Sequence, residues 1–180
     1  MDREKLFDVI KTIAKEIEAE KELLTDLDNA IGDGDHGINM ARGFKAVLEK
    51  LPNLAEKDCG AVLKGVGMAL VSNVGGASGP LYGTFFMKAG DALKGKMEIN
   101  AADFLASFSS AVAGVKMRGK ATEGEKTMLD ALCPAERAME EAVEGGKSLK
   151  EAVSAAADAA RKGSESTKDI IATKGRASYL

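Results

Sequence analysis

The sequence predicts an all-α protein, an antiparallel bundle of amphipathic helices. Apolar residues recur at steps of three and four over most of its 180 residues, with charged residues between them. No segment shows the sustained alternation of apolar and polar residues that marks a half-buried strand. A chain of this length hides roughly 70% of the surface that it would expose unfolded, so it can form a core without disulfides or a structural metal. We therefore expect a single domain over residues 1–180.

Seven helices are expected, and the first three have clear boundary residues. Asp2 can cap the first, which reaches about Leu24. The second follows a Gly-rich interruption and is ended by Pro52, because proline cannot continue the hydrogen-bond ladder. Asp58 can cap the third, an unusually small-residue helix that a neighbour could approach closely. The apolar stripe expected on the first helix is Leu6, Val9, Ile10, Ile13, Ile17 and Leu24.

Pro80 stands where a helix favours proline, in the first turn of the fourth helix, which reaches about Leu93. Asn100 can cap the fifth, and Asp103 is placed to favour the positive end of its dipole.

The sixth helix follows a polar stretch, RGKATEGEK, and we expect a kink near Pro134. Ser148 and Glu151 form a capping box for the seventh, an Ala-rich helix that extends toward Ile171.

Composition excludes several classes of protein. Lys and Arg number 25 against 28 Asp and Glu, and both signs are interleaved, which argues against a nucleic-acid groove or a basic membrane surface. No run of about 18 apolar residues occurs, and the first 22 residues lack the features of a signal peptide, so the cytoplasm is the expected location. Cys59 and Cys133 are expected to be buried thiols in a reducing compartment.

Glycine is clustered in two places. Two groups of four, at Gly32, Gly34, Gly37 and Gly43 and at Gly75, Gly76, Gly79 and Gly83, each open a helix. Glycine within a helix costs about 1 kcal/mol relative to alanine, so a helical chain that clusters it uses it where a positive φ or a close backbone approach is required.

The first cluster carries three aspartates within eight residues, Asp28, Asp33 and Asp35. A tight turn can aim all three inward, and their convergence would require a compensating cation. Carboxylate oxygens without a neighbouring thiolate suit Mg²⁺ or Ca²⁺ better than Zn²⁺. The spacing alone equally allows a solvated Asp/Gly turn.

The second cluster, SNVGGASGPLYG, feeds a proline-started helix and exposes backbone N–H groups at the positive end of a helix dipole. Phosphate is the obvious ligand for such a group of N–H donors. The alternative is a tight interhelical turn with small residues for close packing. Together, a carboxylate turn and a phosphate cradle are the two parts of a site for Mg²⁺ with a nucleotide or polyphosphate.

Four strings carry a family resemblance: IGDGDHGINMARGF, VGGASGPLYGTFF, RGKATEGEKTM and KGRASYL. In this order they closely resemble the nucleotide-binding L subunits of bacterial dihydroxyacetone kinases that are fed by the phosphoenolpyruvate phosphotransferase system. The likeness extends from about Leu24 to the last residue. It implies a barrel of eight amphipathic helices with the nucleotide at one end.

The resemblance also implies the activity and partners. A tightly held ADP with two Mg²⁺ is rephosphorylated in place by the phosphoryl-donor M subunit, and the ATP formed phosphorylates dihydroxyacetone held on a separate K subunit. A transcription regulator is a further implied partner. Two alternatives remain: the nucleotide domain of an ATP-dependent kinase, disfavoured because Met1 begins the first helix directly, and an ADP-loaded regulatory module.

Site residues follow from the resemblance position by position. Asp28, Asp33 and Asp35 match the Mg²⁺ ligands, and no general base is assigned. The expected nucleotide contacts are His36, Gly37, Ile38, Asn39, Ala77, Ser78, Gly119, Met128 and Arg176. From the residues alone, His36 could be a satisfied turn residue and Met128 a core residue. The cations Arg118, Lys120 and Lys126 are expected in a solvated loop outside the site.

One departure from the family concerns the end of the sequence. Family chains continue past KGRASYL into a G-E-R-S-x-G-H-x-D-P-G segment and a last helix, so seven helices are expected here rather than eight. We expect a protein ending at Leu180 to bind ADP more weakly than one that carries the extra segment, which calorimetry would measure.

Overall fold

The computed structural model describes residues 1–179, and all regular elements in that range are helices. The α-helices are α1 (Arg3–Ala19), α2 (Lys21–Asn29), α3 (His36–Lys50), α4 (Cys59–Asn73), α5 (Ser78–Ala92), α6 (Ala101–Gly119), α7 (Leu129–Glu144) and α8 (Leu149–Ser166). Short 3₁₀ turns are η1 (Leu51–Leu54), η2 (Thr167–Asp169) and η3 (Arg176–Tyr179). The all-α prediction is therefore confirmed.

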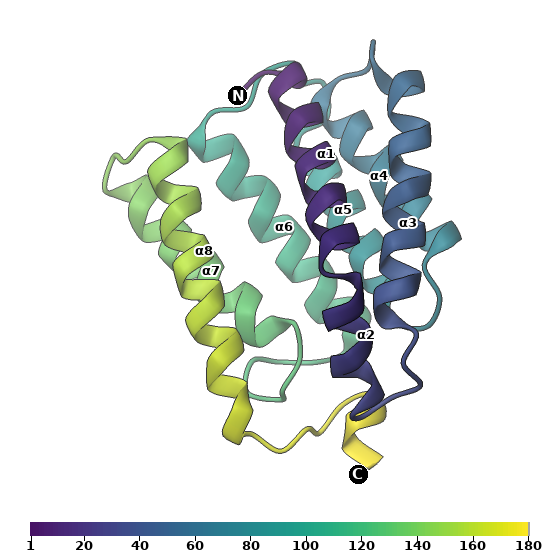
Figure 1. Ribbon diagram of the computed structural model, residues 1–180. Coiled ribbons are helices and arrows are strands. Elements are labelled where there is room, and N and C mark those ends of the chain that lie inside the picture. The colour runs from purple at the N-terminus through teal and green to yellow at the C-terminus, as the bar shows by residue number, and fades with distance from the viewer. Residues whose placement is uncertain (180) are drawn as a thin grey trace.

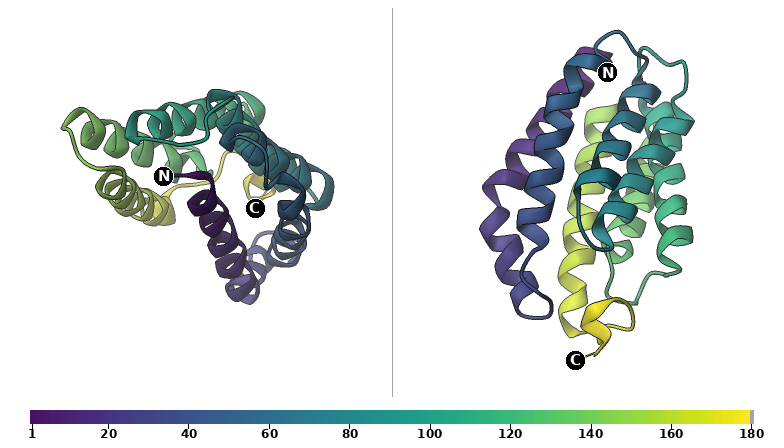
Figure 2. Two further views of the ribbon diagram at one scale, coloured as in Figure 1. Left: turned by 90° about the horizontal axis from the view of Figure 1, so that it is seen from above. Right: turned by 90° about the vertical axis from the view of Figure 1, so that its right-hand side faces the viewer.

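The helices run up and down and follow one another around an open ring (Figure 1; Figure 2, left). Consecutive helices pack together, most extensively α4 with α5 and α7 with α8. Because the order is antiparallel, the α2–α3, α4–α5 and α6–α7 loops lie at one end of the bundle together with the C-terminal segment (Figure 1). Both Gly-rich loops are thus at the same end.

The expected count of seven helices was wrong, because the first expected helix is two. Glu20 leaves the helical conformation with φ −93° and ψ 10°, which separates α1 from α2. The Glu20 N–H still donates to the Glu16 carbonyl at 2.9 Å, so the apolar period continues across the break. The sequence pattern therefore does not show that the helix is divided. Val9, expected in the apolar stripe, is 37% exposed.

The seventh expected helix, α8, ends at Ser166 and does not reach Ile171. The hydroxyls of Ser166 and Thr167 donate to the carbonyls of Gly163 and Ser164, both at 2.8 Å. These side chains offer the last turn an alternative to further backbone hydrogen bonds. Pro134 lies within α7, and the kink expected near it stays a prediction.

The predicted caps are confirmed. Asp2 accepts from the Lys5 N–H and Asp58 from the Ala61 N–H, both at 2.8 Å. Complete capping boxes begin α6 (Asn100 with Asp103) and α8 (Ser148 with Glu151). Each cap satisfies N–H groups that have no partner inside the helix.

The core lies on the inner faces of the helices, and glycine brings α4 and α5 close together. A Cβ on Gly67 would lie 2.6 Å from the Gly83 carbonyl oxygen, and one on Gly60 2.5 Å from the Gly90 carbonyl oxygen. Cys59 and Cys133 are buried free thiols, as expected. Burial raises the pKa of both thiols. Across the described residues, no helix combines the length and the apolar character needed to span a bilayer.

Candidate functional site

Three carboxylates converge between α2 and α3. Asp28 lies in the last turn of α2, Asp33 in the connecting turn, and Asp35 directly before α3. One oxygen from each lies within 4.8 Å of the others. Gly34 has φ +71°, and a Cβ there would collide with the Asn29 side chain, so the turn requires glycine at this position.

The N-terminus of α3 orders this cluster. Oδ2 of Asp28 accepts from the backbone N–H groups of Asp35 at 2.9 Å and His36 at 3.2 Å. The positive end of the helix dipole favours a carboxylate at this place. Oδ2 of Asp33 lies 2.8 Å from Nη1 of Arg176, so the C-terminal segment contacts the cluster as well.

The donor set fits a hard divalent cation. Three carboxylates of like charge repel one another at these separations, and a shared cation would offset that repulsion. Oxygen ligands without thiolate or imidazole in the set are those of Mg²⁺ or Ca²⁺. Asp28, Asp33 and Asp35 could therefore hold such an ion.

A cavity of about 620 Å³ adjoins the cluster. His36 joins the two, because its N–H donates to Asp28 while its ring faces the cavity. Nδ1 of His36 lies 3.1 Å from Oγ of Ser78, which links the start of α3 to the start of α5. Ala77, the N-cap of α5, has no side-chain oxygen to accept from the first N–H groups of that helix, so these donors can serve an anion.

The lining of the cavity combines cationic and apolar residues. Arg118, Lys126 and Lys174 contribute positive charge, and apolar surface comes from Leu81, Val115, Met128 and Leu129. Tyr82 also lines the cavity, and burial raises the pKa of its phenol. A flat apolar group beside a polyanion would match this lining.

The structure gathers five of the expected nucleotide contacts around the cavity: His36, Ala77, Ser78, Gly119 and Met128. The other four are not in its lining. Gly37 is buried where α3 meets α2, and a Cβ there would meet the Lys21 carbonyl. Oδ1 of the buried Asn39 accepts from Nη2 of Arg42 at 2.6 Å, and Ile38 is 53% exposed. Arg176 pairs with Asp33.

Sequence reasoning left Arg118 and Lys126 in a solvated loop and did not consider Lys174, yet all three line the cavity. Lys120, the third cation of that loop, is exposed outside this lining. The available signal was position in the chain: residues 118–128 and residues 174–179 both lie at or beyond the end of a helix that ends where the glycine-rich loops lie.

Comparisons with known proteins identify a matching family and several similar chains. Residues 30–180 match the family described as the DAK2 domain. The PEP-dependent dihydroxyacetone kinase, ADP-binding subunit DhaL, of Escherichia coli K12 is 47% identical over 161 residues, which cover 89% of this chain and 77% of that protein. The corresponding subunit of dihydroxyacetone kinase 2 from Listeria innocua is 43% identical, over 96% of this chain and 80% of that protein.

More distant relatives are longer proteins. Triokinase/FMN cyclase of Mus musculus is 34% identical over 89% of this chain, which corresponds to 28% of that protein. Among solved structures, the dihydroxyacetone kinase from C. freundii in complex with AMP-PNP and Mg²⁺ superposes with a TM-score of 0.74 at 26% identity. That match covers 89% of this chain and 28% of the kinase chain.

Proposed function

The chain belongs to the DAK2 domain family, and on that premise we propose that it is the ADP-binding subunit of a phosphoenolpyruvate-dependent dihydroxyacetone kinase. In this proposal its bound ADP is rephosphorylated in place by the phosphoryl-donor subunit of a phosphotransferase system. The ATP formed phosphorylates dihydroxyacetone on a separate substrate-binding subunit, in the cytoplasm. The observation that carries the proposal is the carboxylate cluster beside a cavity whose lining includes three cationic residues, with His36 contacting both.

In this proposal different residues bind the metal ions, the phosphates and the base of the nucleotide. Asp28, Asp33 and Asp35 would hold Mg²⁺, for which we propose two ions; bound Mg²⁺ neutralises phosphate charge and orients the transferred group. The first N–H groups of α5, with Ser78, would bind phosphate oxygens. The apolar side chains of Leu81 and Met128 in the cavity lining would contact the base of the nucleotide.

Cationic side chains complete the site. Arg118, Lys126 and Lys174 would offset the negative charge of the polyphosphate, and Arg is suited to bidentate contact with its oxygens. Phosphoryl transfer depends mainly on positioning and electrostatic stabilisation. This chain therefore needs no general base of its own, and the acceptor hydroxyl would be activated on the partner.

Native mass spectrometry of the protein as purified tests the proposal. We expect the mass of one ADP and two Mg²⁺ in addition to that of the protein, and this added mass should persist through dialysis. The bound ADP should then accept a phosphoryl group from a phosphotransferase donor. Asp28→Asn should lose the metal mass, whereas Asp26→Asn, an exposed α2 residue outside the cluster, should keep it. Wild-type protein without nucleotide mass would count against a bound-cofactor role.

An ATP-dependent kinase is the second candidate, because the chain also matches part of longer kinases such as triokinase. Under that hypothesis the nucleotide exchanges freely, and ATP alone supports turnover when a substrate-binding partner is added. Turnover that requires the phosphotransferase donor would exclude it.

A further inference from the structure

The α6–α7 loop, residues 120–128, is held in shape by a buried carboxylate. Asp130 is only 4% exposed and accepts from the backbone N–H groups of Gly124 and Thr127. The bond from Thr127 is 2.7 Å long. Within this loop Lys126 has φ +56°, a backbone conformation that a residue with a Cβ adopts only where its surroundings require it. The loop is therefore an ordered part of the site.

Two adjacent side chains of this loop reach the C-terminal segment, residues 167–176. Nζ of Lys126 donates to the Thr167 carbonyl at 2.7 Å and to the Lys168 carbonyl at 3.5 Å, just beyond the end of α8. A cation at the negative end of a helix is favourable, and a hydrogen bond from a charged donor is stronger than a neutral one.

Glu125 contacts the same segment further along. Its Oε1 lies 3.6 Å from Nζ of Lys174 and accepts from the Thr173 hydroxyl at 3.5 Å. The Thr122 N–H, and then the charge of Lys174, hold the pKa of Glu125 below its ordinary value. Glu125 itself does not line the cavity.

The C-terminal segment passes across the cavity between two anchors. One anchor is the pair Glu125 and Lys126, and the other is the 2.8 Å ion pair of Arg176 with Asp33. Lys174, which belongs to the first anchor, and Gly175, which lies between the two, line the cavity. A ligand in the cavity therefore contacts a segment whose position depends on Glu125 and Lys126.

We propose that Glu125 and Lys126 are positioning residues that hold the C-terminal segment over the cavity and thereby set how long a nucleotide stays bound. The inference rests on the proposed function, since it takes the cavity as the nucleotide site. In this proposal the nucleotide leaves past the segment, and the contacts of Glu125 and Lys126 oppose the movement of the segment.

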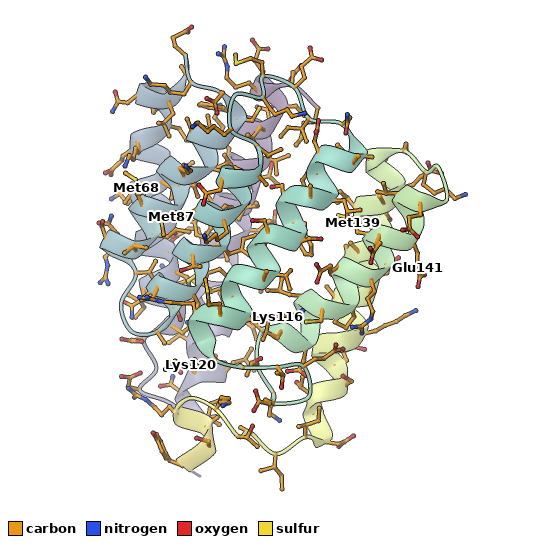
Figure 3. The ribbon with its side chains drawn as sticks, turned by 180° about the vertical axis from the view of Figure 1, so that it is seen from behind. Met68, Met87, Lys116, Lys120, Met139 and Glu141 are labelled. Atoms are coloured by element: carbon orange, nitrogen blue, oxygen red, sulfur yellow. The ribbon has the colours of Figure 1, made fainter. Side chains whose placement is uncertain are left out.

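Limited trypsin digestion without nucleotide tests the anchoring by itself. Lys126→Met keeps the apolar stem and removes the ammonium, and it should speed cleavage after Lys174 and Arg176 about tenfold, as expected for loss of a charge-assisted hydrogen bond. Lys126→Arg should restore slow cleavage. Lys120→Met is the matched control, because Lys120 (Figure 3) lies in the same loop, also with positive φ, but outside the cavity lining. Equal cleavage of Lys126→Met and wild type, with equal thermal stability, would overturn the inference.

Release of a fluorescent ADP analogue in Mg²⁺ tests the consequence. Because Lys126 lines the cavity, Glu125→Gln is the decisive variant, and it should raise the dissociation rate about threefold with little change in the association rate. Glu123→Gln is its control, since Glu123 pairs with Arg137 instead. An unchanged dissociation rate in Glu125→Gln would refute the positioning role. Wild-type protein that never binds the analogue would refute the proposed function, while the digestion would still report on the anchoring.

Discussion

Asp35→Asn distinguishes two effects of the carboxylate cluster: the repulsion that destabilises the protein without metal, and the binding of a metal ion that stabilises it. Asp35 is exposed at the N-cap of α3, where its side chain makes no capping hydrogen bond. Asparagine has the same shape and is as good an N-cap residue as aspartate. The backbone N–H that residue 35 donates to Asp28 is unaffected. The substitution therefore removes one negative charge and little else.

The expected size of the effect follows from the separations. Two unit charges 4.8 Å apart repel by about 0.9 kcal/mol in a water-like dielectric, and Asp35 takes part in two such pairs. The N-terminal dipole of α3 favours the Asp35 charge by about 0.3–1 kcal/mol, so without metal the variant should gain about 1 kcal/mol of unfolding free energy. For a chain of this size, that raises Tm by roughly 2–4 °C. Asp33→Asn should gain less, because Arg176 already offsets the charge of Asp33.

Magnesium should reverse the order of stability. A ligand at 100 times its dissociation constant stabilises the folded state by about 2.7 kcal/mol, and this gain is reduced when a ligand carboxylate is lost. Urea or thermal unfolding of wild type, Asp35→Asn and the control Asp26→Asn, each in EDTA and in Mg²⁺, measures both effects. A variant that is less stable than wild type in EDTA, or that keeps the full magnesium gain, would refute the reasoning.

Two further predictions concern the fold. Gly67→Ala should lower the unfolding free energy by about 1–3 kcal/mol, because its Cβ would lie 2.6 Å from the Gly83 carbonyl oxygen and α5 would have to shift; an unchanged urea midpoint would contradict this account of the α4–α5 contact. The Lys96 ammonium, 2.7 Å away, and then the Asn100 N–H hold the pKa of Asp103 below its ordinary value. This contribution to stability is complete above the ordinary pKa of aspartate and is lost as the pH falls through the lowered pKa of Asp103. Asp103→Asn should therefore make the unfolding free energy fall less steeply as the pH is lowered. Equal slopes in the variant and in wild type would count against this prediction.

Local signals were reliable in this sequence. Asp58 and Ser148 cap the helices that they were expected to cap, because a cap depends on an N–H only three residues away. The convergence of Asp28, Asp33 and Asp35 is local as well, since one glycine-containing turn between two helices brings them together. The end of α8 is also accompanied by local contacts, the hydrogen bonds donated by the Ser166 and Thr167 hydroxyls. Several serines and threonines of the chain could form such bonds, so the sequence pattern did not show at which residue the helix ends.

By itself, then, the sequence determined the helical class, most helix boundaries, the carboxylate turn and, through its motifs, the family. Only the tertiary structure decided which cations surround the cavity. Arg118 and Lys126 come from the end of α6 and the α6–α7 loop, and Lys174 comes from the C-terminal segment; they meet because antiparallel helices return their loops to one end. The same packing turned Gly37 and Asn39 away from the cavity and toward neighbouring side chains and backbone. Periodicity shows which face of a helix is apolar, whereas the partner of that face depends on the order and spacing of all the helices.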